Sequence, residues 1–126
     1  MPQRAGPRVL FADDDPILHR LLDMNFRLIG IEVEAVARGD EALRRAIEAP
    51  PDVVILDATM PGMTGHEVYR GLRAEPALAR TPVVFLTGRS ADEFDAYLGD
   101  RVHVVTKPFD MTALVDLVRG AIEAPG

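Results

Sequence analysis

The most informative stretch is Val9-Leu10-Phe11-Ala12-Asp13-Asp14-Asp15-Pro16, in which four apolar residues run directly into three acids and a proline. The apolar run is typical of a short buried strand. Asp15 can cap a helix that begins at Pro16, because a residue in the first helical turn needs no N–H of its own. The stretch therefore predicts a strand that passes straight into a helix, with acids at the junction.

The same alternation of apolar runs and amphipathic segments continues along the chain. Further strands are predicted over residues 31–37, 53–56, 83–86 and 102–105. Helices are predicted to begin at Pro16, at Gly39, and after the capping residues Thr64, Ser90 and Asp110. Ser90 forms a capping box with Glu93, and the helix that follows is short because Gly99 ends it.

Strands that alternate with helices predict an α/β fold with one doubly wound, five-stranded parallel sheet, in which a (βα) unit repeats five times. We expect the strand order 2-1-3-4-5. Sheets of this kind bind ligands outside the carboxyl ends of their strands, here between strands one and three. The residues that directly follow the strands are therefore the candidate functional residues.

Composition limits the class of protein and its surroundings. The 126 residues are 48% hydrophobic and include no cysteine, which suits an ordinary core and excludes thiol catalysis. The net charge of -6 has the wrong sign for binding a nucleic-acid backbone, and no apolar run approaches the roughly 20 residues of a membrane helix. We expect a cytoplasmic protein with one domain over residues 8–123 and tails over 1–7 and 124–126.

Reactive side chains lie at the ends of four predicted strands. Asp13 and Asp14 follow the first strand, Asp57 the third and Thr87 the fourth, and Lys107 lies just beyond the fifth. Each residue alone would be an ordinary turn, cap or surface group. Three carboxylates together repel by about 4 kcal/mol per pair at ~4 Å and an effective dielectric of ~20, so their gathering indicates a bound cation.

Magnesium suits this set of side chains, because it prefers oxygen ligands and leaves room for water and phosphate oxygens. The Lys107 ammonium and the Thr87 hydroxyl can both donate to phosphoryl oxygens. A carboxylate can itself attack phosphorus and become an aspartyl phosphate. The sequence therefore indicates a site for phosphoryl transfer.

Four segments, in the right order, resemble the receiver domain of bacterial two-component response regulators, and the resemblance covers essentially the whole chain. These segments are residues 9–16, 56–65, 83–88 and 105–109, the last containing Lys107-Pro108-Phe109. The resemblance implies the flavodoxin-like, CheY-like form of the predicted fold. It also implies a phosphoprotein of phosphorelay signal transduction that needs Mg²⁺.

The resemblance assigns a role to each candidate residue. Asp57 is the phosphoacceptor and takes its phosphoryl group from a phosphohistidine of a sensor histidine kinase or a histidine phosphotransfer protein. The implied Mg²⁺ ligands are Asp13, Asp14, Asp57 and the backbone carbonyl of Thr59. Lys107 and Thr87 contact the phosphoryl oxygens, and the Lys107–Pro108 bond is cis.

The family also implies a conformational switch, which this sequence alters. Thr87 is the switch hydroxyl, but Val104 stands where the family has its switch aromatic, and valine has no ring to swing. We therefore expect residues 88–101 to respond to phosphorylation, with Phe94 or Tyr97 as the ring that changes its exposure.

Partner docking is expected on the first helix, which carries two apolar stripes although the sheet can cover only one. Leu18 is the expected exposed residue, together with Pro108 in the loop after Lys107. A downstream target protein or a fused output domain would detect the switch. The sequence fits either a free-standing receiver or the receiver part of a longer regulator or hybrid kinase.

Two alternatives remain. Asp13-x-Asp15 after a first strand imitates the nucleophile motif of haloacid-dehalogenase-like phosphatases, but that reading leaves Asp57 unexplained. A receiver-fold binding module that is never phosphorylated should lack an acid or the lysine, and neither is missing. In the favoured interpretation the protein is not an enzyme, apart from its own phosphorylation and autodephosphorylation.

The histidines give no sign of a metal site. His66-Glu67 begins an HExxH pattern, but Arg70 stands where the second histidine is required. His19 and His103 lack partners at ligand spacing and are expected to be surface or packing residues.

Overall fold

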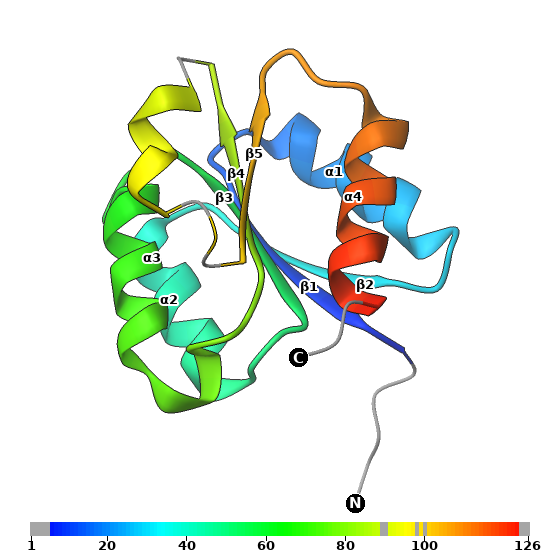
Figure 1. Ribbon diagram of the computed structural model, residues 1–126. Helices are drawn as coiled ribbons and strands as arrows, with labels where there is room; N and C mark the ends of the chain where they lie inside the picture. Colours follow the sequence, from blue (N-terminus) through cyan, green and yellow to red (C-terminus); the bar gives the residue numbers. More distant parts are fainter. Residues whose placement is uncertain (1–5, 89–90, 98, 100, 124–126) are drawn as a thin grey trace, which may run out of the picture.

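The computed structural model describes residues 6–88, 91–97, 99 and 101–123, and contains a five-stranded parallel sheet (Figure 1). The strands are β1 (Arg8–Ala12), β2 (Glu32–Val36), β3 (Val53–Asp57), β4 (Val83–Thr87) and β5 (Val102–Thr106). Their order is β2-β1-β3-β4-β5, and all four pairs are parallel. The predicted fold class and strand order are confirmed.

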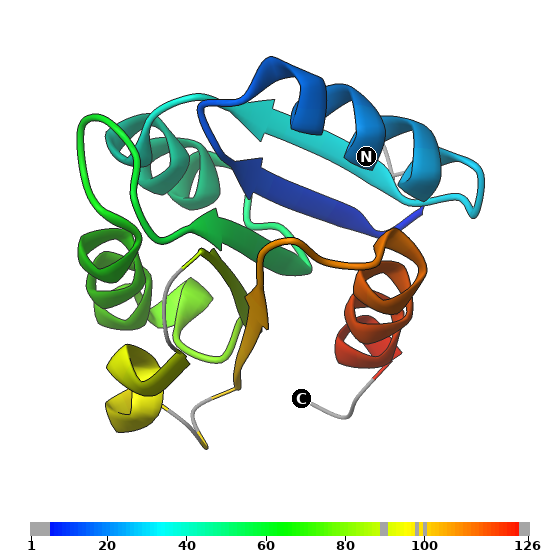
Figure 2. The ribbon, with the colours of Figure 1, turned by 90° about the horizontal axis from the view of Figure 1, so that it is seen from above.

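Helices cover both faces of the sheet. They are α1 (Pro16–Arg27), α2 (Gly39–Glu48), α3 (Gly65–Ala74) and α4 (Met111–Glu123), with 3-10 helices η1 (Pro76–Leu78) and η2 (Ala91–Tyr97). Figure 2 shows α1 and α4 on one face, and α2, α3 and η2 on the other. Among the described helices, none has the length and apolar character needed to cross a membrane.

The core consists of two layers separated by the sheet. Strands β1, β3 and β4 are buried along their whole length, and their alternate residues point to opposite faces. Leu22 and Phe26 of α1 pack with Leu114 and Val118 of α4 on one face. Buried residues of α2, α3 and η2 fill the other face. Burial of both faces explains why these strands are continuous apolar runs.

The local signals in the sequence act as predicted. The Asp15 side chain accepts a hydrogen bond from the Ile17 N–H (2.9 Å) and caps α1. Thr64 and Glu67 form both bonds of a capping box at the start of α3. Gly30, just after α1, has a φ of +81°, a conformation that glycine adopts readily where a helix ends.

The segment between β4 and β5 differs from the prediction. Residues 91–97 form a 3-10 helix, whereas the capping box with Ser90 predicted an α-helix; Ser90 itself lies outside the described residues. A 3-10 helix rises about 2.0 Å per residue against about 1.5 Å for an α-helix. Since only 20 positions separate Thr87 from Lys107, the more extended helix spans the crossover with fewer residues.

The predicted tails lie mostly outside the described residues, namely residues 1–5 and 124–126. Pro7, placed in the N-terminal tail by the sequence, already contacts the sheet, because its carbonyl accepts a hydrogen bond from the Glu32 N–H (3.0 Å).

Candidate functional site

The carboxylates predicted to gather at the sheet edge do so. Asp13 and Asp14 follow β1, and Asp57 is the last residue of β3, the neighbouring strand. One oxygen of each carboxylate lies within 4.8 Å of the others. The position is the expected one, at the carboxyl ends of strands one and three.

Asp13 is the most deeply buried acid of this cluster, with only 1% of its surface exposed. Its Oδ1 accepts a hydrogen bond from the Asp15 N–H (2.9 Å), and its own N–H donates to the Val36 carbonyl (3.1 Å). The His19 ring contacts the Asp13 carbonyl through Nε2 and packs edge-on against Phe11. His19 is therefore a packing residue, as expected, and it holds the acidic loop in place.

Asp57 is nearly buried, with 9% of its surface exposed. Its Oδ1 accepts a hydrogen bond from the Thr59 N–H (3.2 Å). Burial raises the pKa of the carboxyl above its usual range, and the charges of Asp13 and Asp14 act in the same direction. The Thr59 N–H and the Lys107 ammonium partly oppose this rise in pKa. The negative charge of this carboxylate is therefore only partly compensated.

Lys107 is the only lysine in the sequence, and it points at this cluster. Its Nζ lies 3.3 Å from Asp13 Oδ2 and 3.6 Å from Asp57 Oδ2. Its backbone N–H donates to the Thr87 carbonyl (2.7 Å), which ties the loop after β5 to the end of β4. The Lys107–Pro108 bond is cis, as the family resemblance implied.

Thr87 is the last residue of β4 and lies at the same edge of the sheet as the acidic cluster. It is 2% exposed, and β4 lies directly beside β3, where Asp57 is opposite Leu86 in the register. The sheet therefore brings Asp57, Thr87 and Lys107 to three adjacent strand ends.

The residues present fit a hard divalent cation. Three carboxylates offer oxygen ligands, one of them exposed at Asp14, while a single ammonium faces them. Mg²⁺ takes such oxygen ligands and keeps several waters. Thr59, whose carbonyl the family resemblance adds to this set, lies beside the cluster through its N–H bond to Asp57.

The expected switch position, Val104, lies on β5 and is partly buried against the core layer that contains Phe85 and Phe94. Phe94 is fully buried, and Tyr97 packs against the same layer. The rings that could replace the missing switch aromatic thus come from η2.

Leu18 is half-buried, so its expected exposure is wrong. It packs toward the core beneath α1, because it lies one turn before Leu22, which is fully buried. It still lines a hollow of about 410 Å³ with Pro108, Phe109 and Met111, beside Lys107. The two predicted docking residues therefore share one surface.

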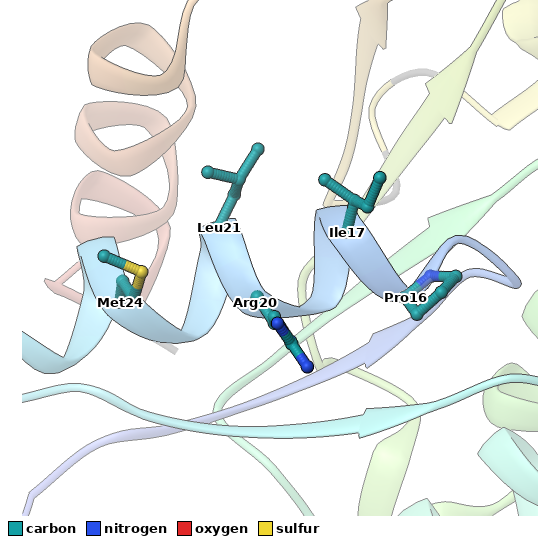
Figure 3. Close-up of a pocket in the computed structure, with 5 residues that line it drawn as sticks. All are labelled: Pro16, Ile17, Arg20, Leu21 and Met24. Carbon is teal, nitrogen blue, oxygen red and sulfur yellow. The ribbon is translucent and has the colours of Figure 1, made fainter.

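The exposed apolar stripe of α1 lies elsewhere on the helix. Ile17, Leu21, Met24 and Leu28 are 68%, 44%, 62% and 84% exposed. Figure 3 shows Ile17 and Leu21 projecting to the same side of α1. Leu21 also lines the hollow beside Pro108, so it joins the stripe to that hollow.

Sequence reasoning missed His66. The sequence pattern considered for His66 was an HExxH zinc motif, which compares it with position 70. Its hydrogen-bond partners in the structure lie 27 and 31 positions further along the chain. Its ring contacts Glu93 and Tyr97 of η2. No pattern within one segment could have revealed that pairing.

A doubly wound sheet that carries a buried carboxylate, two further acids and a lysine at its switch point defines a receiver-type phosphotransfer protein. Residues 9–119 match the family model described as response regulator receiver domain. The chain therefore belongs to this family and is a receiver domain of the two-component type.

Individual proteins agree with this assignment. The transcriptional regulatory protein KdpE of Mycobacterium tuberculosis is 40% identical over 116 residues, which is 90% of this chain and 50% of that protein. The receiver domain of the Francisella response regulator 1452 has a TM-score of 0.84 at 28% identity, covering 94% of this chain and 98% of that one.

A third relative bears on the metal. The receiver domain of the sensor histidine kinase PA1611 from Pseudomonas aeruginosa has a TM-score of 0.79 at 26% identity, covering 95% of this chain and 100% of that one. Its structure contains a magnesium ion coordinated in the active-site cleft. The family and the strand order are those of receivers, so neither finding favours the phosphatase alternative.

The chain spans about half the length of the curated relatives it matches. Two of the curated relatives, RpaA of Synechocystis and MtrA of Mycolicibacterium smegmatis, are named as DNA-binding regulators. The absence of direct nucleic-acid binding therefore stays a prediction, which rests on the acidic charge of these 126 residues alone.

Proposed function

We propose that this receiver takes a phosphoryl group from a partner phosphohistidine onto Asp57, in a reaction that requires Mg²⁺. The observation that supports this most strongly is the setting of Asp57, a nearly buried carboxylate with Lys107 at 3.6 Å and two more carboxylates beside it. Such a group is exposed enough to react but not solvated enough to be an ordinary surface acid.

The reaction is a displacement at phosphorus. An Asp57 oxygen forms a bond to phosphorus, the P–N bond to the partner imidazole breaks, and that imidazole leaves with the electron pair and takes up a proton. Lys107 and the Thr87 hydroxyl donate to the phosphoryl oxygens as charge shifts among them. Asp13, Asp14 and Asp57 would hold Mg²⁺, which supplies positive charge between the carboxylates and the phosphoryl group.

We propose that the partner is a sensor histidine kinase or a histidine phosphotransfer protein, and that it docks on α1 and the loop after β5. The hollow lined by Leu18, Leu21, Pro108 and Met111 lies beside Lys107, so a partner seated there would bring its phosphohistidine to the site. A target protein or fused output domain would read the result. On this proposal the receiver is cytoplasmic and has no enzyme activity on other molecules.

Intact-mass measurement tests the proposal. The protein is incubated with acetyl phosphate and Mg²⁺, and should gain the mass of one phosphoryl group. The gain should vanish in Asp57→Asn and in wild type treated with a chelator. Equal phosphorylation of Asp57→Asn would contradict the assignment of the acceptor, and equal phosphorylation under chelation would contradict the role of the metal.

A further inference from the structure

His66 fastens η2 to α3 through both of its ring nitrogens. Nδ1 lies 2.9 Å from the Tyr97 hydroxyl, and Nε2 lies 3.0 Å from Glu93 Oε1. The ring also stacks on Phe94, with centroids 4.8 Å apart and planes at 3°. All three partners belong to η2, which lies beside α3 in Figures 1 and 2.

Glu93 restricts the direction of one of these hydrogen bonds. A carboxylate can only accept, so Nε2 is the donor in this pair. A ring with its single proton on Nε2 accepts from the Tyr97 O–H at Nδ1, and this tautomer satisfies both η2 residues at once.

The three-residue period of η2 suits this contact. In a 3-10 helix, residues three apart line up on one side, which places Phe94 and Tyr97 in one row facing His66. An α-helix would offset the two residues by about 60° around its axis, although they would still share one face. The 3-10 helix aligns Phe94 and Tyr97 more closely on the side of His66.

The other end of the arrangement is the acceptor segment. His66 follows Gly65, whose N–H donates to the Ala58 carbonyl (3.2 Å). A methyl group at Gly65 would lie 2.7 Å from the Asp57 carbonyl oxygen, so backbone packs on backbone here without spare room. A shift of the chain around Asp57 therefore reaches His66 directly.

We propose that His66 is a positioning residue that couples the Asp57 site to η2 and holds η2 in its resting position. The inference rests on the proposed phosphorylation of Asp57 and adds a second connection to the one through Thr87. In this proposal the rings of Phe94 and Tyr97, which contact His66, take part in the switch in place of the aromatic residue that Val104 replaces. Because such coupling is reciprocal, loosening the clamp should favour the phosphorylated state.

Calorimetric titration with beryllofluoride, a phosphoryl mimic, in the presence of Mg²⁺ tests the coupling. His66→Phe keeps an aromatic ring and removes both hydrogen bonds. Its affinity for beryllofluoride should rise about fivefold over wild type. A residue with only a structural role would lower the stability of the fold and leave this affinity unchanged.

Matched variants keep the test decisive. Glu93→Ala and Tyr97→Phe each remove one hydrogen bond to His66 and should each raise the affinity, whereas Asp95→Ala, which removes an exposed carboxylate from the same helix, should not. If His66→Phe fails to fold, the two η2 variants carry the test. A rise of less than twofold, or an equal rise in Asp95→Ala, overturns the inference. Failure of wild type to bind would instead contradict the proposed function and this inference with it.

Discussion

Asp57 is the side chain whose ionisation the fold opposes. Burial raises its pKa above the usual 3.8, with Asp13 and Asp14 contributing, so its charged form costs stability. That cost is absent below the pKa of the unfolded chain and is complete once the pH exceeds the raised pKa of the folded protein. The proposed function needs the charged form, so this residue trades stability for reactivity.

Because ionisation of Asp57 lowers the stability of the fold, removing the charge should raise it. Without Mg²⁺, Asp57→Asn should be more stable than wild type in urea unfolding at pH 7, and the difference should shrink as the pH falls toward 4. Asp116→Asn, on the exposed face of α4, should change little at either pH. A less stable Asp57→Asn at pH 7 would show that the fold does not penalise this charge.

Lys107 has the single ammonium group that forms ion pairs with Asp13 and Asp57, so its removal can be tested separately. Lys107→Met should slow phosphorylation by acetyl phosphate about 100-fold, the usual cost of losing one donor to the reacting oxygens. Its Mg²⁺ affinity should not fall, since a competing cation has been removed.

Lys107→Arg is the matched control, because it keeps the charge in a broader, planar group. It should recover Mg²⁺ behaviour like that of wild type but only part of the rate. Rates for Lys107→Met within threefold of wild type would remove Lys107 from the reaction.

At the scale of elements, the proposed docking surface on α1 lies beside Lys107, one of the residues proposed to react. Leu22 and Phe26 hold the helix to the sheet, while Leu21 belongs both to the exposed stripe and to the hollow beside Lys107. Leu21→Gln should slow transfer from the cognate phosphohistidine about tenfold, equivalent to about 1.4 kcal/mol. Phosphorylation by acetyl phosphate should be unaffected, because no protein has to dock.

Leu28→Gln is the control, since Leu28 is more exposed but lies at the far end of α1 from the site. Its transfer rate should match wild type. If Leu28→Gln slows transfer as much as Leu21→Gln, the docking surface follows the whole stripe and is not centred on the hollow.

The start of α3 gives a prediction about the acceptor segment. Gly65→Ala would place a methyl group 2.7 Å from the Asp57 carbonyl oxygen and 3.1 Å from Ala58 Cα. Unfolding in urea should show a loss of about 1–3 kcal/mol from this overpacking. Gly120→Ala, in α4 with nothing within 4 Å, should instead stabilise the protein by about 1 kcal/mol. Equal effects would refute the close packing at Gly65.

Local signals explain which elements could be predicted from the sequence. Asp15 and Thr64 cap α1 and α3 with hydrogen bonds inside one segment, and the apolar runs of β1, β3 and β4 are buried on both faces. The type of η2 could not be predicted in this way, because it is set by the distance between β4 and β5 that the segment has to cross, and because its hydrogen-bond partner His66 lies in another element. The prediction that Leu18 is exposed was also wrong, because two apolar stripes on one helix do not reveal which of them faces the sheet.

In the molecule as a whole, the candidate site residues lie together at one edge of the sheet. The position of the site could be predicted, because a parallel sheet places the carboxyl ends of β1, β3, β4 and β5 at the same edge regardless of how the loops fold. The path toward η2 could not, because it joins residues 27 and 31 positions apart through side chains alone.

The proposed function is tested most directly by identifying the residue that carries the phosphoryl group. The protein is phosphorylated with acetyl phosphate and Mg²⁺, reduced with borohydride, which converts an aspartyl phosphate to homoserine, digested and sequenced by mass spectrometry. We predict homoserine at position 57 alone, and none when Mg²⁺ is chelated. Homoserine at Asp13 or Asp14, or an unmodified Asp57 in a protein that has gained a phosphoryl group, would contradict it.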